Sequence, residues 1–231
     1  MKITIVCDNY VSRQDLIAGW GFSCLIETQE ENVLFDLGES EETFSHNFSM
    51  LGINPEKIHT VVISHDHHDH TGGLRWFLGA NPRVNICVLS SFSKETKDIV
   101  RHFGAKPVSV DKVYYISDKL CVIAMKSFIN EQFLLIKTSK GLVIITGCSH
   151  PGIIDIVEEA KSIGDVYMLL GGFHLLGETR EELENIAEKL KESGVKKISP
   201  CHCSGDRTRK VFSETFGENF MSCGAGRVIK L

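Results

Sequence analysis

Long apolar runs are missing from this sequence of 231 residues. Its two most apolar stretches, residues 142–148 and 166–176, are far shorter than the roughly 20 residues that a membrane-spanning helix needs. The N-terminus enters a strand-like pattern directly, without the apolar segment and small-residue cleavage site of a signal peptide. These absences predict a cytoplasmic protein with no contact to a membrane.

An excess of positive charge is also missing. The chain has 25 lysines and arginines against 30 aspartates and glutamates, so its net charge is −5. Proteins that bind nucleic acids in general carry a basic patch or stripe, and the composition therefore argues against a nucleic-acid partner. A local basic patch for one phosphorylated small molecule is still compatible with it.

Cys-x-x-Cys pairs, low-complexity segments and flexible linkers are absent. Five of the eight cysteines lie in or beside apolar strand-like runs, where a reduced cysteine behaves as a small hydrophobe. A disulfide framework is not expected in a cytosolic chain of this length. Nothing marks a domain boundary, and α/β domains often reach about 200–250 residues. We therefore expect residues 1–231 to form a single domain.

Hydrophobic periodicity predicts alternating strands and helices. Strands are expected at residues 2–7, 22–28, 33–35, 60–63, 84–89, 113–116, 120–124, 132–138, 142–145, 166–170, 196–199 and 228–231. Helices are expected at residues 41–51, 93–102, 151–162, 179–192 and 206–216. Pro151 is expected in the first turn of the third helix, and Thr179 with Glu182 fits a capping box at the start of the fourth. Interleaved strands and helices indicate a layered α/β fold.

Six consecutive ionisable residues follow the strand expected at 60–63. They are His65, Asp66, His67, His68, Asp69 and His70, and a glycine pair follows closely. A solvated polar turn accounts for one or two such residues, but not for four histidines and two aspartates in six positions. Imidazole and carboxylate are the ligands that zinc and similar divalent ions prefer. The segment therefore predicts a metal site.

Three more histidines follow predicted strands. His150, His174 and His202 come after the strands at 142–145, 166–170 and 196–199. The carboxyl ends of strands in α/β folds meet at one rim, where ligands bind. A buried, hydrogen-bonded histidine explains any one of them alone, but the shared position favours metal ligation by His150 and His202. For His174 both interpretations stay open.

The pattern His65-x-His67-x-Asp69-His70 resembles the His-x-His-x-Asp-His signature of the metallo-β-lactamase superfamily. Residues 34–38 resemble the first motif of that superfamily, His150 resembles the third and His202 the last. Residues 7–9, 21–23, 146–152, 171–175 and 200–205 are similar to its dihydropterin-ribofuranosylaminobenzene-phosphate synthase-like branch. The resemblance implies an α/β fold of four layers, an αββα sandwich of two mixed sheets flanked by helices.

The resemblance also implies how the site is divided. His65, His67 and His150 would hold one divalent ion, and Asp69, His70 and His202 a second. Zinc is expected, with iron or manganese as alternatives, at one or two ions per chain. A metal-activated water would be the nucleophile, and Asp69 would orient it. Asp36 would not contact the metal itself but would orient a ligand histidine or its loop.

One departure from the superfamily concerns the aspartate that usually bridges the two ions. The strand that should supply it ends Gly171-Gly172-Phe173-His174, and no carboxylate follows until Glu178. Gly172 falls at about the expected position. Either His174 supplies a replacement contact, as a ligand or a catalytic hydrogen-bond donor, or the second ion is held more weakly.

The neighbours of these residues have simpler interpretations. Asp66 and His68 fill the variable positions of the signature and should point away from the metals, although an outer role for His68 stays open. Cys201 and Cys203 flank His202 and are expected to pack. Asn9, at the end of the first strand, is a candidate substrate contact.

Arg207 is the second candidate substrate contact. It lies near the start of the helix expected at 206–216, where free amides favour anions. A solvated first helical turn explains the same residues equally well.

These features predict a metal-dependent hydrolase, or a hydroxide-assisted transferase, for a small anionic or phosphorylated, pterin-like metabolite. A flavodiiron reductase would carry glutamate where this chain has His67, and a nuclease would need extra domains or a basic arm. The alternative from a different class is a non-catalytic metal-binding or ligand-sensing module of the same fold. Nothing in the sequence predicts the oligomeric state.

Overall fold

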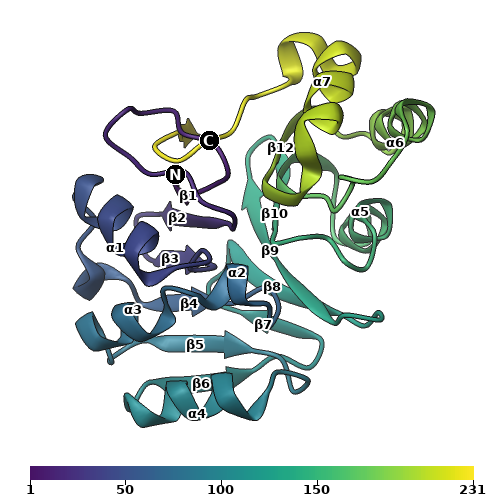
Figure 1. Ribbon diagram of the computed structural model, residues 1–231. Coiled ribbons are helices and arrows are strands. Elements are labelled where there is room, and N and C mark those ends of the chain that lie inside the picture. The colour runs from purple at the N-terminus through teal and green to yellow at the C-terminus, as the bar shows by residue number, and fades with distance from the viewer.

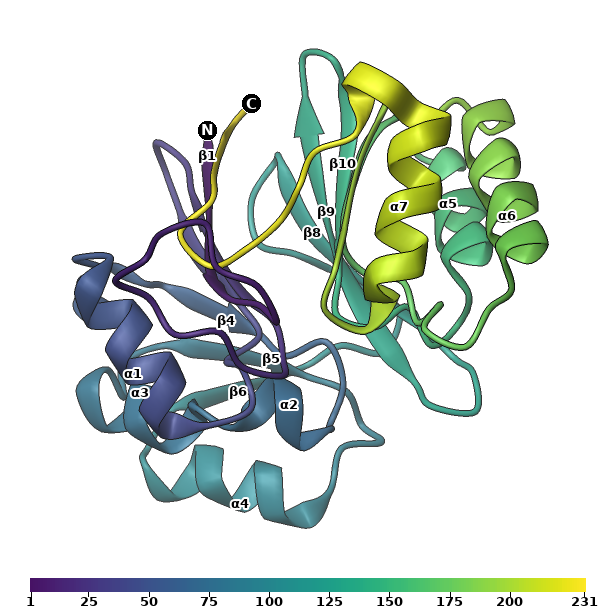
Figure 2. The same cartoon turned by 45° about the horizontal axis from the view of Figure 1, so that its top comes forward.

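Two sheets packed face to face, with helices on both outer sides, make up the computed structural model, which describes residues 1–231 (Figures 1 and 2). One sheet is covered by α1 (Glu41–Met50), α3 (Leu74–Ala80) and α4 (Lys94–His102). The other is covered by α5 (Ile153–Lys161), α6 (Arg180–Glu192) and α7 (Gly205–Phe216). The αββα sandwich expected from the sequence is confirmed.

The first sheet has seven strands in the order β13-β1-β2-β3-β4-β5-β6. In chain order these are β1 (Lys2–Cys7), β2 (Ser23–Glu27), β3 (Asn32–Phe35), β4 (Thr60–Val62), β5 (Asn85–Val88), β6 (Lys106–Ser109) and β13 (Val228–Lys230). The pairs from β13 to β3 are antiparallel, and those from β3 to β6 are parallel. The strand expected at 228–231 is thus confirmed as β13, at one edge of this sheet.

The second sheet has six strands in the order β12-β11-β10-β9-β8-β7. They are β7 (Val113–Tyr115), β8 (Leu120–Met125), β9 (Glu131–Thr138), β10 (Gly141–Thr146), β11 (Val166–Gly172) and β12 (Lys197–Cys201). β10, β11 and β12 are parallel to one another, and the other pairs of this sheet are antiparallel. β9 and β10 form an antiparallel hairpin.

The second sheet is buried on both faces, which explains its continuous apolar runs. In β10, Val143 and Ile145 join the core of 41 residues that includes the space between the sheets. Leu142 and Ile144 point the other way, into a second core of 22 residues beneath α5, α6 and α7. Burying each such side chain stabilises the fold by roughly 1.5–3 kcal/mol.

Most predicted elements are confirmed to within a residue or two, including the capping box of Thr179 and Glu182. The prediction that Pro151 lies in the first turn of a helix is wrong, because α5 begins at Ile153 with Gly152 as its N-cap at φ 103°. The preceding loop is held in a turn, in which the Gly152 N–H donates to the Ser149 carbonyl at 2.8 Å. The helix therefore cannot start at the proline.

Several elements give no clear signal in the sequence. They are α2 (His68–Thr71), α3, β6 and the short 3-10 turns η1 (Pro55–Lys57), η2 (His202–Ser204) and η3 (Gly217–Asn219). β6 is a largely exposed edge strand that contains Pro107, so it has neither an apolar run nor strand propensity. No helix combines the length and apolarity that spanning a bilayer requires.

Candidate metal centre

The carboxyl ends of strands from both sheets meet at one edge of the sandwich, and the loops that leave them carry the candidate residues (Figures 1 and 2). Four residues other than glycine have positive φ, and all lie just beyond such strand ends: Asp36, Ser149, His174 and His202. Such backbone strain persists only where surrounding contacts hold it, and it clusters at functional sites.

Three imidazoles converge in the first set of candidate ligands. Nε2 of His65 lies 3.1 Å from Nδ1 of His67 and 3.3 Å from Nε2 of His150. Two imidazoles on a tetrahedral zinc ion have their nitrogens about 3.3 Å apart, given zinc–nitrogen bonds of about 2.0–2.1 Å. The first set therefore fits a divalent ion. His67 is exposed and His150 half-buried, so the set faces solvent.

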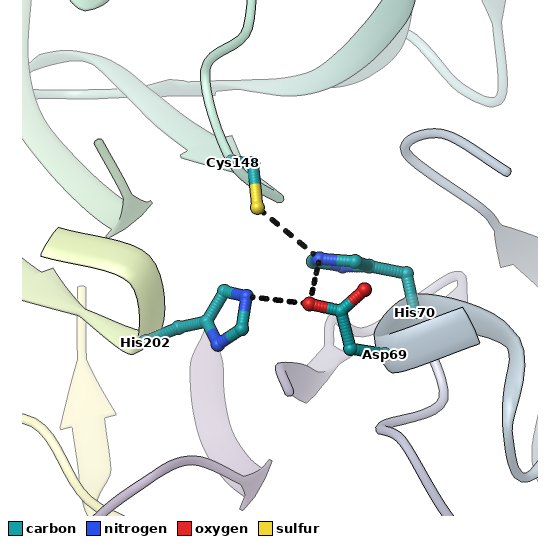
Figure 3. Close-up of side chains that lie close together, drawn as sticks. All are labelled: Asp69, His70, Cys148 and His202. Carbon is teal, nitrogen blue, oxygen red and sulfur yellow. Dashed lines mark hydrogen bonds and ion pairs between the residues drawn. The ribbon is translucent and has the colours of Figure 1, made fainter. Parts of the chain in front are cut away.

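The second set lies deeper, and its side chains are shown in Figure 3. Oδ2 of Asp69 lies 3.2 Å from Nε2 of His202 and 3.6 Å from Nε2 of His70. Nε2 of His202 is buried and has no hydrogen-bond partner, because its contact with that carboxylate oxygen is not in hydrogen-bond geometry. A buried polar atom without a partner is costly, and a bound cation would satisfy it. The second set therefore also fits a divalent ion.

The outer ring nitrogens of the histidines are held by neighbouring side chains. Oδ2 of Asp36 lies 2.7 Å from Nδ1 of His70 and accepts from the Ser64 hydroxyl at 2.8 Å. That hydroxyl lies 2.9 Å from Nδ1 of His65. A proton held on Nδ1 leaves Nε2 free for a metal, which is how outer contacts orient ligand histidines. Asp36 thus sits where the sequence analysis expects it.

Asp8 and Asn9, at the end of β1, hold the loop of His202. Oδ1 of Asp8 accepts from the His202 backbone N–H at 3.0 Å, and burial raises the pKa of Asp8 to about 6. Oδ1 of Asn9 lies 3.1 Å from Nδ1 of His202, and the Gly21 N–H lies 3.3 Å from that oxygen and 3.2 Å from that nitrogen. The Asn9 amide is therefore engaged with His202, and its role as a substrate contact stays a prediction.

The environment shifts the pKa values of the metal-free ligands in opposite directions. Burial opposes the charged form of His70, but Asp36 outweighs it and raises the pKa to about 9. Burial and the neighbouring His174 lower the pKa of His150 to about 4. Burial acts against the ionised form of Asp69, yet His202 and His70 hold its pKa below the usual range. A metal entering the second set must therefore displace a proton from His70 at neutral pH.

Replacing Asp36 by asparagine should weaken metal binding by about 10–100-fold, the usual effect of losing an outer partner of a ligand histidine. The amide cannot serve both His70 and Ser64 as the carboxylate does. Competition with a chromogenic chelator measures the affinity. Asp66→Asn is the matched control, because Asp66 points away and accepts from Ser93 N–H and the Thr96 hydroxyl, each at 2.5 Å. Equal affinities for the two variants would contradict the role of Asp36.

Glu131 is a residue that the sequence analysis missed. It is buried at the start of β9, and its Oε1 accepts from the backbone N–H groups of Gly147, Cys148 and Ser149 at 2.9–3.1 Å. Oε2 accepts from the His150 N–H at 2.8 Å. Burial raises the pKa of Glu131, and these N–H groups limit the rise. The only available signal was a lone glutamate at the head of an apolar run.

His174 reaches the edge of the site. Its ring centroid lies 4.5 Å from that of His150, and a ring nitrogen lies within 4.8 Å of the sulfurs of Cys148 and Cys203. Cys203, expected to pack, therefore also faces this region, whereas Cys201 lies beside Asp8 in the core. The geometry leaves both a ligand role and a substrate role for His174 available.

Arg207 does not join the site. Its guanidinium donates to the Glu178 carbonyl at 2.9 Å on the exposed surface. At the adjoining start of α7, the Ser204 hydroxyl accepts from the Phe173 N–H at 3.0 Å, and Asp206 accepts from the Tyr10 hydroxyl at 2.5 Å. An acidic side chain already occupies this helix start, so an anion subsite there stays only a prediction.

Trp20 borders the second set and was also missed. Its Nε1–H donates to Oδ2 of Asp69 at 3.0 Å, and its ring centroid lies 5.1 Å from that of His202. The side chain is nevertheless 45% exposed. An exposed indole beside a metal centre offers a flat surface to an aromatic ligand. No sequence pattern marks this residue.

Gly172 explains why no bridging carboxylate is present. A Cβ at this position would lie 2.3 Å from the Gly147 carbonyl oxygen and 2.6 Å from Sγ of Cys203. Both distances are far below van der Waals contact, so β11 and β10 approach too closely for any side chain here. The missing aspartate is therefore a property of the packing as well as of the sequence.

Several known proteins are similar to this chain in sequence and structure. A sequence model of the metallo-beta-lactamase superfamily matches residues 21–159. A relative from Methanocaldococcus jannaschii, 7,8-dihydropterin-6-methyl-4-(beta-D-ribofuranosyl)-aminobenzene-5'-phosphate synthase, is 29% identical over 91% of this chain and 89% of its own. The crystal structure of Tm1679, a metal-dependent hydrolase of the beta-lactamase superfamily, is similar with a TM-score of 0.85 and 28% identity, covering 100% of this chain and 99% of that chain. The metallo-beta-lactamase fold protein YhfI from Bacillus subtilis shares the fold, with a TM-score of 0.73 and 16% identity over 99% of each chain.

Proposed function

The chain belongs to the metallo-β-lactamase superfamily, and from that premise we propose that it is a metal-dependent hydrolase, or a hydroxide-assisted transferase, for a small anionic metabolite. One observation carries the proposal. Two sets of ligand atoms, from strand ends of both sheets, are spaced as divalent ions require and lie side by side. His65 belongs to the first set and its ring centroid lies 4.2 Å from that of His70 in the second.

Each residue has a proposed role that follows from its position. His65, His67 and His150 hold one ion, and Asp69, His70 and His202 hold the other. Bound ions of this kind lower the pKa of water to about 7 and polarise a substrate oxygen. His174, beside His150 at the exposed edge, donates a hydrogen bond to negative charge that develops on the substrate. Asp36, Asp8 and Asn9 position ligands.

The substrate class is proposed as anionic and aromatic, in line with a phosphorylated or pterin-like metabolite. The relative from Methanocaldococcus jannaschii is named for a pterin joined to a ribofuranosylaminobenzene phosphate. The indole of Trp20 lies beside the second set, where an aromatic ring could stack on it. Two bound cations would attract an anionic group of the substrate. Such a group can approach from solvent, because the first set is exposed.

A panel of substrates tests this function. Metal-loaded protein should hydrolyse a nitrophenyl phosphodiester, a nitrophenyl ester or a lactone, or should join a ribofuranosylaminobenzene phosphate to a dihydropterin that carries a phosphorylated hydroxymethyl group, with release of that phosphate group. Chelator treatment should abolish turnover, and added zinc, manganese or iron should restore it. Tight binding of these compounds without any turnover would instead support a ligand-sensing module.

Replacing Trp20 by alanine should weaken binding of an aromatic anion by about 1–3 kcal/mol, the range found for stacking of a base on an aromatic side chain. Calorimetric titration with a pterin measures the effect. Trp20→Phe should retain most of the affinity because it keeps a ring. Tyr115→Ala is the matched control, since Tyr115 is 66% exposed on β7, the edge strand of the second sheet. Undiminished binding by Trp20→Ala would exclude stacking on this residue.

A further inference from the structure

We propose that the Cys148 thiolate is a metal ligand that completes the second set and takes the place of the missing carboxylate. The proposal rests on the metal centre described under the proposed function, and it assigns that centre a sulfur ligand. The sequence analysis treated this cysteine only as part of a motif. Four side chains would then surround one ion. Two are anionic, the Asp69 carboxylate and the Cys148 thiolate, and two are neutral imidazoles, those of His70 and His202.

The position of the sulfur carries the proposal. Sγ of Cys148 lies 3.3 Å from Nε2 of His70 (Figure 3). The ligand atoms of Asp69, His70, Cys148 and His202 all lie within 4.8 Å of one another. Sγ also lies within 4.8 Å of the ligand atoms of His65 and His150 in the first set. Cys148 therefore lies between the two sets, where a bridging carboxylate would be expected.

The spacing fits coordination. A sulfur and an imidazole nitrogen on one tetrahedral zinc ion lie about 3.5 Å apart, given bonds of about 2.3 and 2.0–2.1 Å. The 3.3 Å contact to His70 matches this and is equally compatible with a hydrogen bond. A hydrogen bond between these two residues, however, leaves the buried Nε2 of His202 with only its 3.2 Å contact to Asp69, which is not in hydrogen-bond geometry. An ion among the four donors satisfies that nitrogen as well.

The packing explains why a cysteine supplies the ligand. At Gly172 no side chain fits, because the Gly147 carbonyl and the Cys203 sulfur occupy the space. The neighbouring strand end can supply a donor instead, since Cys148 follows β10. Its backbone N–H donates to the buried carboxylate of Glu131 at 2.9 Å, which fixes the loop. Cys148 is 3% exposed, so its thiol lies in the protein interior.

The consequence is a difference between the two ions. Four protein donors close the second set, as in tightly held tetrahedral sites, whereas three imidazoles in the first set leave a position open. A thiolate also restores the negative charge that the missing aspartate removes. The second ion should therefore be the tighter one, opposite to the expectation from the sequence, and sulfur ligation favours zinc or iron over manganese.

Cobalt-substituted protein provides the test, because a thiolate bound to cobalt(II) gives an intense near-ultraviolet charge-transfer band. We expect this band in the native protein and in Cys203→Ser, and its loss in Cys148→Ser. Cys148→Ser should also bind one ion at least about a hundredfold more weakly, as measured by competition with a chelator, since even outer-shell losses cost 10–100-fold. Cys121→Ser, which removes a buried thiol from β8, controls for general effects on folding.

X-ray absorption of the native zinc-loaded protein needs no variant and should show a sulfur neighbour. Metal binding without a sulfur signal would overturn the assignment of Cys148 and leave the proposed function standing. A band that survives in Cys148→Ser but disappears in Cys203→Ser would also overturn it. Failure of the native protein to bind any divalent ion would instead overturn the proposed function.

Discussion

Replacing His65 and His67 together by alanine should remove the ion of the first set and lower turnover by about a thousandfold or more, because a water then keeps its ordinary, much higher pKa instead of one of about 7. The two imidazoles are two of the three donors that converge there. The second set shares neither side chain and should keep its ion. Mass-spectrometric metal analysis and turnover of the best substrate of the panel measure the two effects.

His68→Ala is the matched control for that double variant. It removes a histidine from the same segment, but His68 is exposed on α2, beside Thr71 and Arg75 rather than the ligands. It should keep both the metal content and the turnover of the native protein. An unchanged metal content in the double variant would refute the first set as a metal site. Loss of activity in His68→Ala would assign that residue the outer role left open by the sequence.

Replacing Glu131 by leucine should destabilise the protein by at least about 4 kcal/mol, because four buried backbone N–H groups would lose their acceptor at roughly 1–3 kcal/mol each. Those N–H groups belong to the loop that carries Cys148 and His150. The same variant should therefore lose metal affinity wherever it still folds. Urea unfolding of chelator-treated protein measures the stability without any contribution from the metal.

Two further variants separate charge from general disruption at this position. Glu131→Gln keeps one acceptor oxygen and should lose only part of the stability. Glu192→Leu, at the exposed end of α6, should change the free energy of unfolding by no more than about 0.5 kcal/mol. A Glu131→Leu protein as stable as the native one would show that the loop finds other acceptors.

The strands and most helices were predictable because their signals are local. Strand periodicity in residues 142–145 and the capping box at Thr179 depend on a few neighbouring residues. Elements without such signals were missed, as with edge strand β6 and its proline. Pro151 was misplaced because Glu131, 20 residues earlier in the chain, holds the preceding loop and delays the helix.

The sequence by itself indicated a layered α/β fold, and its resemblance to a known superfamily implied the αββα sandwich. It also pointed to eight residues that gather at the site. Two ligands of each set lie within His65 to His70, and such a short segment brings its own side chains together. His150, His174 and His202 followed from their shared place after buried strands, because parallel strand ends meet at one edge. Asp36 followed from the resemblance.

Only the tertiary structure decided which other side chains face those ligands. Cys148 reaches His70, Glu131 holds the loop of His150, and Trp20 contacts Asp69, across separations of 78, 19 and 49 residues. Arg207, close to His202 in the chain, turns away toward Glu178 instead. Contacts of this range depend on how the two sheets pack, and no local pattern encodes them. The close approach of β10 and β11 at Gly172 is of the same kind, and it leaves a thiol rather than a carboxylate beside the second set.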